Sequence, residues 1–462
     1  GAADGYARMA DNPAVVLLHL GPGLANGIAN LHNARKAHSS VVNIVGDHAT
    51  FHLKHDAPLT SDIISLSKPV STWVHKAETS AQVGAVTSKA IAAAKKPPGG
   101  VATLILPADC AWNENGQPGN IPTIDRKRSL DWQNIKRIVQ VLRSNEPVIF
   151  YITGPALMSR GLNLLARIQK ISNARIFSQT FNSRAQRGAG RFRVDRLPYA
   201  MPLARKVLSD CAHLILVGTK PPVSFFGYPQ SNSLLAPSTC QIHTLATLEQ
   251  DIIEALEYLT EELNAPQKVG ALPDLVRPCM PQGNFTSEKI WACLAALMPE
   301  NSIVVHEAIT SSFGEEKWMP NAPSHDWLDL TGGAIGSGLP LATGAALACP
   351  DRKVFTMQAD GSAMYTLQAL WTQAREHLDV VTIIFANRTY AILQNEFKRV
   401  GADSIGPNAM SVLNIGNPDL DWVNLAQAMG VMAGRAETCE DFAKQLKIAV
   451  ANSGPYLIEA RL

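Results

Sequence analysis

Residues 353–398 read KVFTMQADGSAMYTLQALWTQAREHLDVVTIIFANRTYAILQNEFK, and this stretch decides the fold. The apolar run 354–357 predicts a buried strand that ends shortly before Asp360, and the run 380–385 predicts a second strand that ends shortly before Asn387. The segment between the two runs has helical spacing. A strand, a helix and a strand of this length predict a right-handed crossover, so Asp360 and Asn387 are expected at the same edge of one parallel sheet.

The helix of this crossover is predicted to have one apolar face. Leu367, Leu370, Trp371 and Ala374 recur at i, i+3, i+4 and i+7 along the segment. We therefore expect these four side chains to pack together against the sheet.

The same alternation continues along the chain, because short apolar runs recur and most are separated by stretches with helical spacing. The other runs are 14–20, 41–45, 101–106, 148–152, 214–217, 303–305 and 456–458. Such strands indicate parallel sheets covered on both faces. Residues 112–129 and 264–284 are rich in Pro, Gly and polar residues and are interpreted as linkers. The predicted fold class is α/β, with three doubly wound parallel-sheet domains at 1–112, 130–263 and 285–462.

The amino-acid composition indicates which classes of binding partner and which cellular compartment to expect. The 462 residues are 46% hydrophobic, and 41 Lys+Arg against 39 Asp+Glu leave a formal charge of +2, which favours neither nucleic acid nor an anionic membrane. The seven Cys include no C-x-x-C pair, as is typical of reduced thiols. No apolar run reaches the roughly 18 residues of a membrane span, and no signal segment is present. The prediction is a soluble, cytoplasmic protein.

Oxygen-bearing side chains at the predicted sheet edge suit a hard cation. Mg²⁺ prefers about six oxygen ligands and usually combines one or two protein groups with phosphates. Asp360 offers a carboxylate, Asn387 an amide oxygen and Thr389 a backbone carbonyl. Gly361 permits close backbone approach, and Ser362 lies where a helix begins and N–H groups face an anion. The alternative interpretation is that Asp-Gly-Ser is a simple turn and Asn387 an ordinary loop residue.

These residues resemble the thiamine diphosphate motif, G-D-G followed some thirty residues later by N-N, of enzymes such as acetolactate synthase, pyruvate decarboxylase and benzoylformate decarboxylase. The resemblance covers nearly the whole chain. It implies that Asp360, Asn387 and the carbonyl of Thr389 bind Mg²⁺ and that thiamine diphosphate is the cofactor. Ala359 replaces the first Gly and Ala386 the first Asn. Neither position is a metal ligand in the family pattern.

Upstream, TGGAIGSGLP at 331–340 resembles the family segment that holds the rings of the cofactor. The resemblance implies that Ile335 supports the thiazolium ring and forces the cofactor into its bent shape. It also implies that the carbonyl of Gly333 accepts a hydrogen bond from the aminopyrimidine. The alternative is that Ile335 is a core residue. Contacts to the diphosphate are implied at Thr310, Ser311 and the backbone of Tyr390.

The first block opens with GAADGYARMADNPAVVLLHLGPGLANGIANLHNA, which resembles the pyrimidine-binding domain of the family, where a helix and a strand lead into a Gly-rich turn. His19 precedes that turn, and some relatives have a catalytic His there for proton transfer. A structural His at a strand end is the alternative. His52 and His55 lie near a histidine pair of family decarboxylases, although solvated loop residues are the preferred interpretation.

The family also uses a Glu that hydrogen-bonds the aminopyrimidine, and this acid is expected before Gly1. No residue of the sequence fits that role, so the first domain is expected to be N-terminally incomplete and to lack one strand of its sheet. Residues 130–263 resemble the central Rossmann-like domain, which carries FAD in acetolactate synthases; no glycine fingerprint argues for FAD here. The basic stretch 178–191 is interpreted as a solvated or interface loop rather than a ligand site.

The resemblance predicts decarboxylation of a 2-keto acid followed by carboligation, as in acetolactate synthase. The alternatives are a simple decarboxylase of the benzoylformate decarboxylase type and a non-catalytic, cofactor-binding relative. Because the first and third domains of the family enclose the cofactor from different subunits, a homodimer or homotetramer is expected.

Overall fold

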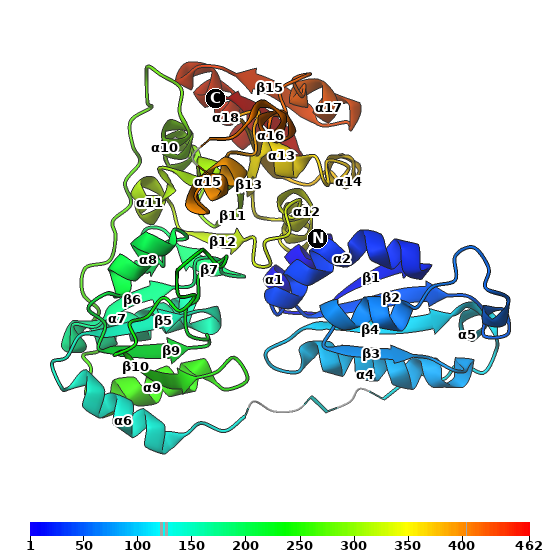
Figure 1. Ribbon diagram of the computed structural model, residues 1–462, viewed down its shortest axis with the longest axis horizontal. Helices are drawn as coiled ribbons and strands as arrows, with labels where there is room; N and C mark the ends of the chain where they lie inside the picture. The colour runs from blue at the N-terminus through cyan, green and yellow to red at the C-terminus, as the bar shows by residue number, and fades with distance from the viewer. Residues whose placement is uncertain (121–122, 125–127, 403) are drawn as a thin grey trace.

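The computed structural model describes residues 1–120, 123–124, 128–402 and 404–462, and it contains three sheets flanked by helices (Figure 1). Every apolar run predicted as a strand forms one. The α/β class with three parallel-sheet units is confirmed, whereas the residues at which the domains divide stay a prediction. Among the described residues, no helix is long and apolar enough to cross a membrane.

The first sheet is wholly parallel and has the order β1-β2-β4-β3. Its strands are β1 (Ala14–His19), β2 (Val41–Asp47), β3 (Trp73–Lys76) and β4 (Val101–Pro107). Its helices are α1 (Ala2–Ala10), α2 (Leu20–Lys36), α3 (Ile63–Ser67), α4 (Val83–Lys95) and α5 (Ala108–Trp112). Helix α5 directly follows β4 and lies at the end of this sheet that is far from the third sheet (Figure 1). The carboxyl ends of these strands therefore point away from the rest of the chain.

The central sheet has the order β10-β9-β5-β6-β8 and is also parallel. Its strands are β5 (Val148–Ile152), β6 (Arg175–Ser178), β8 (Asp195–Arg196), β9 (His213–Val217) and β10 (Gln241–Ala246). Its helices are α6 (Trp132–Leu142), α7 (Ser159–Ser172), α8 (Met201–Leu208) and α9 (Ile252–Glu262). The described residues of the two predicted linkers, 113–129 and 264–284, form no helix and no named strand. The first linker makes one isolated β-bridge, at Arg128.

The third sheet has the order β15-β16-β14-β13-β11-β12-β7. Its parallel strands are β11 (Ser302–Glu307), β12 (His325–Asp329), β13 (Val354–Ala359), β14 (Val380–Ala386), β15 (Met432–Ala436) and β16 (Tyr456–Arg461). Strand β7 (Ala185–Arg187) comes from the middle block and pairs antiparallel with β12. Its longer helices are α10 (Ser287–Leu297), α12 (Gly338–Ala348), α15 (Ala391–Arg399) and α18 (Cys439–Ala451). Its shorter helices are α11 (Glu315–Trp318), α13 (Asp360–Ala363), α14 (Ala369–Arg375), α16 (Pro407–Leu413) and α17 (Trp422–Ala428).

Both faces of the third sheet are buried, which explains its continuous apolar runs. On β11, Ile303 and Val305 pack with Leu341 of α12 on one face. Val304 points to the opposite face and belongs to a core that includes Trp291 of α10. Successive residues of a strand thus enter different cores, so alternation with polar residues is absent.

Helix α1 of the first domain packs directly on α12 of the third (Figure 1). A Cβ atom added at Gly5 would lie 2.0 Å from the carbonyl oxygen of Leu341, and one added at Gly344 would lie 1.8 Å from that of Ala2. The two glycines therefore allow the helix backbones to touch. Close packing of this kind fixes the orientation of the first domain on the third.

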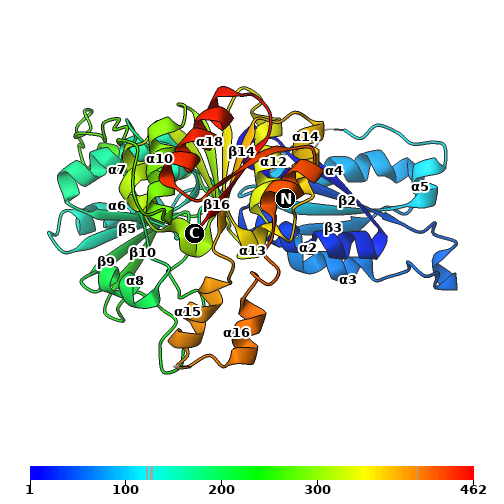
Figure 2. The ribbon, with the colours of Figure 1, turned by 90° about the horizontal axis from the view of Figure 1, so that it is seen from above.

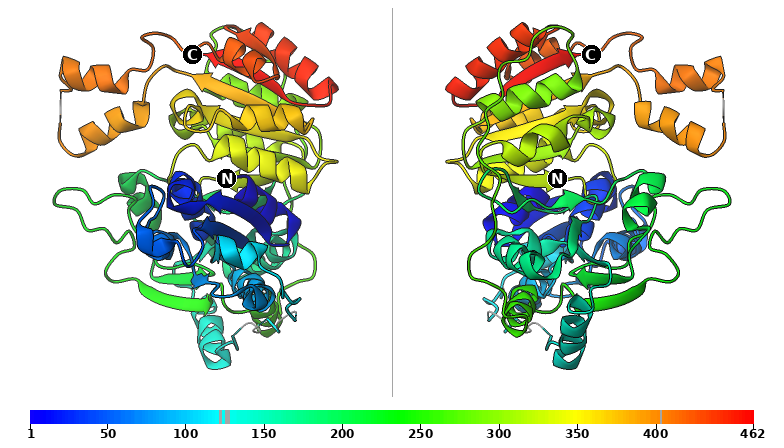
Figure 3. Two further views of the ribbon diagram at one scale, coloured as in Figure 1. Left: turned by 90° about the vertical axis from the view of Figure 1, so that its right-hand side faces the viewer. Right: turned by 90° about the vertical axis from the view of Figure 1, so that its left-hand side faces the viewer.

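Helices α15 and α16 project beyond the body of the third sheet (Figures 2 and 3). Glu396 of α15 accepts hydrogen bonds from the hydroxyls of Tyr199, at 3.2 Å, and Tyr228, at 2.8 Å, which both belong to the central domain. The guanidinium of Arg399 lies 5.2 Å from the ring centroid of Tyr199. The segment that follows the predicted metal ligands therefore rests on the central domain.

Two local predictions need correction. Leu367, Leu370 and Ala374 pack in one core cluster as predicted, but Trp371 is 51% exposed, and helix α14 begins only at Ala369, after Leu367. The inward polar residue is Gln373, whose amide donates to the carbonyl of Leu339 at 3.2 Å. The expected Gly-rich turn after His19 is instead the first turn of α2, which begins at Leu20.

Candidate active site

The predicted site residues of the third domain gather at the carboxyl ends of four neighbouring strands. The chain leaves β11 to form β12 on one side, whereas β13 and then β14 lie on the other side. This reversal opens a crevice at the carboxyl ends of β11 and β13, which is where open parallel sheets bind ligands. The strand–helix–strand connection predicted from residues 353–398 is confirmed, because β13 and β14 pair in parallel with helices α13 and α14 between them, and it lies beside this crevice.

Asp360 follows β13 directly and is only 2% exposed. One carboxylate oxygen accepts from the backbone N–H of Arg388 at 2.7 Å, and the other accepts from its neighbour Gly361 at 2.8 Å. Burial raises the pKa of Asp360, although these backbone hydrogen bonds lower it. The charge of Arg388 also lowers it, but the guanidinium of Arg388 lies 3.8 Å from Asp419 and is not paired with Asp360. A divalent cation would pair with this buried carboxylate.

Asn387 and Thr389 lie beside Asp360, because the carboxylate of Asp360 accepts a hydrogen bond from the backbone N–H of Arg388, which stands between them in the chain. The side-chain oxygen of Asn387 accepts from the N–H of Thr389 at 3.1 Å. Arg388 has a φ of 58°, which makes the tight turn. One carboxylate, one amide oxygen and one carbonyl fit Mg²⁺. Among the described residues, no group of three or more His, Cys, Asp or Glu side chains is placed to hold a metal ion. Softer metals prefer sulfur and imidazole ligands, and the described part of the chain gathers no cluster of that kind.

The residues next to Asp360 show why this turn needs glycine. A Cβ atom at position 361 would lie 2.5 Å from the ring of Tyr390, so only Gly361 lets the ring lie against the turn. The hydroxyl of Ser362 donates to the carbonyl of Ala359 at 3.1 Å and accepts from the amide of Gln358 at 2.7 Å. The hydroxyl is therefore engaged inside the protein, and a diphosphate would meet the backbone here rather than this side chain.

Thr310 and Ser311 lie in the 3₁₀ turn Ile309–Ser312, which follows β11 at the same edge. Ile309 has a φ of 51°, a strained value for a β-branched residue. Ser311 is buried, and its carbonyl accepts from the indole N–H of Trp291 at 3.0 Å. The turn is thus held in a conformation that a free loop would not adopt, as at many ligand sites.

The loop after β12 carries Gly333 and Ile335. Gly333 is exposed with a φ of 75°, and a Cβ atom there would lie 2.9 Å from Cζ of Phe225. Ile335 is half-buried. Asn33 of α2 clamps the loop: its amide donates to the carbonyl of Ala334 at 2.7 Å and its oxygen accepts from the Ala334 N–H at 3.2 Å. Sequence reasoning missed Asn33, because nothing in the local pattern marks a contact across some three hundred residues.

Asn33→Asp is expected to loosen this loop, since a carboxylate oxygen would replace the amide that donates to Ala334. Leaving that partly buried carbonyl unpaired should lower the free energy of unfolding by about 1–3 kcal/mol. Urea unfolding at neutral pH measures the effect. Asn26→Asp is the matched control, because Asn26 lies exposed on the same helix; it should change stability by at most about 0.5 kcal/mol. Equal stability of the two variants would contradict the role of Asn33.

His19 is not brought to this site. It caps α2 at the carboxyl end of β1, is exposed, and pairs in register with Gly46 of β2. His52 lies near the same edge, with its ring centroid 5.3 Å from that of His48 and 5.7 Å from that of His55. This edge points away from the third sheet (Figure 1). The structure therefore joins the third-domain residues into one site and leaves His19 apart from them within the chain.

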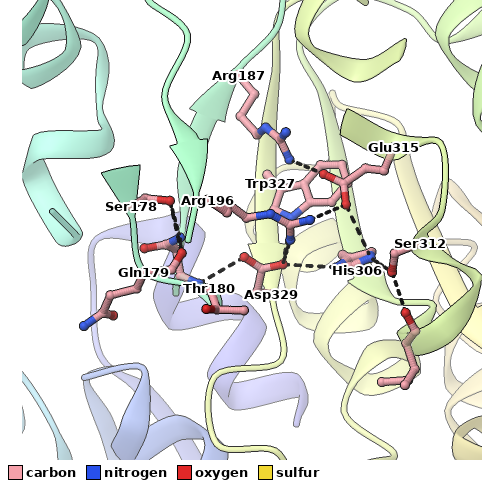
Figure 4. A network of polar contacts seen from close by, with 12 residues as sticks. Ser178, Gln179, Thr180, Arg187, Arg196, His306, Ser312, Glu315, Trp327 and Asp329 are labelled. Atoms are coloured by element: carbon pink, nitrogen blue, oxygen red, sulfur yellow. Dashed lines mark hydrogen bonds and ion pairs between the residues drawn. The ribbon is translucent and has the colours of Figure 1, made fainter. Parts of the chain in front are cut away.

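A buried polar network ties the central domain to the turn after β11 (Figure 4). Glu315 accepts from Arg187 at 2.6 Å and from Arg196 at 2.5 Å. His306 bonds Asp329 at 3.1 Å and the hydroxyl of Ser312 at 2.8 Å. The stretch 178–191 was interpreted as a solvated or interface loop, but its residues Ala185–Arg187 form strand β7, which pairs with β12, and Arg187 lies at the interface between the domains.

The charges of this network are balanced. Burial would raise the pKa of Asp329, but the hydrogen bond from His306 and the charge of Arg196 lower it to about 2. Burial likewise opposes ionisation of Glu315, yet the charges of Arg196 and Arg187 leave its pKa lowered. Both acids are therefore ionised at neutral pH, and they hold the turn that carries Thr310 and Ser311.

The fold and this crevice define a class: α/β proteins whose ligand site lies at the switch point of a parallel sheet. The chain belongs to the thiamine pyrophosphate (thiamine diphosphate) enzyme family. The family model described as thiamine pyrophosphate enzyme, C-terminal TPP binding domain, matches residues 312–460. The model for the N-terminal TPP binding domain matches residues 1–66.

Relatives support this membership over nearly the whole length. The chain is 47% identical over 461 residues to a Mycobacterium tuberculosis protein provisionally named acetolactate synthase large subunit IlvX, covering 99% of the chain and 88% of that protein. It is 30% identical over 490 residues to benzoylformate decarboxylase of Pseudomonas aeruginosa, covering 99% and 89%. A solved thiamine diphosphate-dependent 4-hydroxybenzoylformate decarboxylase of Rhodococcus jostii has a TM-score of 0.87 at 24% identity, covers 100% and 89%, and supports the fold alone.

Proposed function

We propose that this protein is a thiamine diphosphate- and Mg²⁺-dependent enzyme that decarboxylates a 2-keto acid and joins the remaining fragment to a second carbonyl compound. The name of its Mycobacterium tuberculosis relative, acetolactate synthase large subunit, describes a reaction of this kind. The observation that carries the proposal is the buried carboxylate of Asp360 beside Asn387 and Thr389 at the sheet's switch point. That donor set fits the cation of a metal–diphosphate pair.

The proposed roles follow from position. When bound, thiamine diphosphate supplies a nucleophilic carbon and an electron sink for decarboxylation. Asp360, Asn387 and the carbonyl of Thr389 hold Mg²⁺. The Gly333 carbonyl orients the aminopyrimidine and Ile335 supports the thiazolium ring. Diphosphate contacts come from the backbone around Gly361, Ser362 and Tyr390 and from the turn of Thr310 and Ser311.

A second candidate is simple decarboxylation, favoured by the likeness to a benzoylformate decarboxylase. The two reactions share all steps until a proton or a second carbonyl compound is taken up. The test is to supply the full-length protein with thiamine diphosphate, Mg²⁺ and pyruvate, and then bulkier 2-keto acids, and to identify the products. Acetolactate from pyruvate would support the carboligase, and an aldehyde the decarboxylase. Cofactor binding without any CO₂ release would favour a non-catalytic relative.

His19 has a role in this proposal only if a second copy of the chain supplies it. Its sheet edge points away from Asp360 within one chain (Figure 1). We therefore propose a homodimer or homotetramer in which His19 of one subunit transfers protons at the Asp360 site of the other. The cytoplasmic location stays a prediction; the seven cysteines, all described, are free thiols.

Mixing two inactive variants, His19→Ala and Asp360→Ala, is expected to restore activity. A mixed dimer would hold one intact site and one doubly altered site, so random exchange should recover about a quarter of the wild-type rate. Refolding or co-expressing the pair and measuring CO₂ release tests this. Each variant alone is the control. No recovery despite mixed dimers detected by affinity tags would contradict a site shared between subunits.

A further inference from the structure

One buried acid at the crevice has no place in the site described so far. Glu307 ends β11 and is 1% exposed. One of its carboxylate oxygens accepts from the backbone N–H of Gly336 at 2.7 Å, and the other accepts from the N–H of Gly338. Gly336 belongs to the loop that presents Ile335, and Gly338 is the first residue of α12, which follows that loop. A single carboxylate therefore fixes the far half of that loop to the end of a core strand.

The same carboxylate reaches the turn on the other side of the crevice. Gln358 lies opposite Glu307 in the register of β11 and β13. Its amide nitrogen donates to Glu307 at 3.2 Å and to the hydroxyl of Ser362 at 2.7 Å. Ser362 lies two residues after Asp360. Glu307 thus links the ring-holding loop to the turn that carries the proposed metal ligand.

The surrounding atoms leave little space around the hydrogen bonds of Glu307. A Cβ atom at Gly338 would lie 2.0 Å from the side-chain oxygen of Gln358 and 2.9 Å from a carboxylate oxygen of Glu307. Gly336 has a φ of 88°, which favours glycine. The two glycines of TGGAIGSGLP are therefore needed so that the backbone can approach the acid.

The carboxylate has neutral partners. The groups that face it are the backbone N–H groups of Gly336, Ser337 and Gly338 and the side-chain amide of Gln358 on β13. Burial raises the pKa of Glu307 to about 7, although these hydrogen bonds lower it. Burying a carboxylate without a cationic partner is costly, and such groups cluster at functional sites.

We propose that Glu307 is a positioning residue for the cofactor: its carboxylate sets the loop from Gly333 to Gly338 and thereby determines how tightly the rings of the cofactor are held. This role rests on the proposed function, because that function names thiamine diphosphate as the ligand. Glu307 is not assigned contact with the substrate or the cofactor. It acts through Gly336, Gly338 and Gln358.

Glu307→Gln tests the proposal, since an amide nitrogen would face backbone N–H donors where an oxygen now accepts. At about pH 8, the dissociation constant of thiamine diphosphate, titrated with Mg²⁺ by calorimetry, should rise about 10- to 100-fold. Lowering the pH to about 6 protonates Glu307 in the wild type and weakens its binding of the cofactor. The dissociation constant of Glu307→Gln divided by that of the wild type should therefore be smaller at about pH 6 than at about pH 8. The cofactor's own titration cancels in that ratio.

Asp326→Asn is the matched control. Asp326 is a buried acid at the start of β12 in the same sheet, paired with Arg184 at 2.7 Å and Arg352 at 2.6 Å. Its loss should lower the unfolding midpoint and leave the dissociation constant within about twofold, because it touches neither cofactor segment. If Glu307→Gln does not fold, Gln358→Met keeps the shape while removing the link, and it should weaken cofactor binding about tenfold.

Unchanged affinity in Glu307→Gln, or in Gln358→Met, would overturn the positioning role, as would an equal loss in Asp326→Asn. A ratio of dissociation constants that stays constant from about pH 8 to about pH 6 would do the same, because it would show that the charge of Glu307 is irrelevant. Wild-type protein that binds no thiamine diphosphate would overturn the proposed function and this role together, so the two failures are distinguishable.

Discussion

Asp360→Ala should abolish turnover, lowering kcat/KM by about a thousandfold or more, which corresponds to at least about 4 kcal/mol of transition-state stabilisation. The reason is that Asp360 is the proposed site's carboxylate, and it is buried with backbone N–H partners. Without it, Mg²⁺ would lose its one charged protein ligand, and the cofactor's diphosphate would lose the cation that neutralises it. Steady-state rates and calorimetric titration of thiamine diphosphate with Mg²⁺ measure the two effects.

Asp419→Ala is the matched control for this experiment. Asp419 lines a small cavity together with Asp360, but its side chain is 40% exposed and lies 3.8 Å from Arg388 as a surface ion pair. Exposed pairs contribute little, so this variant should keep its rate within about threefold. If Asp360→Ala retained metal-dependent cofactor binding, the assignment of the metal site would be wrong.

Glu315→Gln is expected to have the largest effect on stability, lowering the free energy of unfolding by about 3–5 kcal/mol. Glu315 is fully buried between Arg187 and Arg196, so its loss removes the acid that pairs with Arg187 and leaves Arg196 only its longer contact with Asp329, at 3.5 Å (Figure 4). Urea unfolding at pH 7 measures the change. Asp195→Asn removes an acid from the exposed pair with Arg193, whose side chains are 50% and 56% exposed, and should cost at most about 0.5 kcal/mol.

The same network sets the acid limit of stability. The folded-state pKa of Asp329 is lowered to about 2, and that of Glu315 is also lowered. Carboxyl groups with depressed pKa values stabilise the fold above their ordinary pKa of about 4, and this stabilisation is lost as the pH falls through the depressed value. The wild type should therefore lose stability between about pH 4 and pH 2, and Glu315→Gln should show a shallower loss. Identical slopes would contradict the network's role.

The sequence allowed the crossover to be predicted because both strands are continuous apolar runs and each ends in a turn that its residues require. The position of Asp360 and Asn387 at one edge of a parallel sheet follows from that pattern. Strand β12 was missed because its sequence, HDWLD, has three polar residues out of five and resembles a loop. All five residues are nevertheless buried. Asp326 is paired with arginines and Asp329 with His306 and Arg196, and none of these partners is local.

The residues that hold the loops could not be predicted for the same reason. Asn33, Glu307 and Glu315 act through partners that only the folded chain brings near, across domains or neighbouring strands. Local spacing also misled the assignment of Trp371, since the helix begins later than its apolar spacing indicates and Gln373 takes the inward position. Continuous apolar runs therefore predicted nine of the sixteen strands among the described residues, whereas tertiary hydrogen bonds decided how the site is supported.

The most direct test of the account locates the metal. Full-length protein crystallised with thiamine diphosphate and Mn²⁺ in place of Mg²⁺ would give an anomalous signal at the cation. The account predicts one peak at the carboxyl ends of β13 and β14, with oxygen ligands from Asp360, Asn387 and the Thr389 carbonyl and from the diphosphate. A cofactor bound on the central domain, or a cation held by other residues, would contradict it.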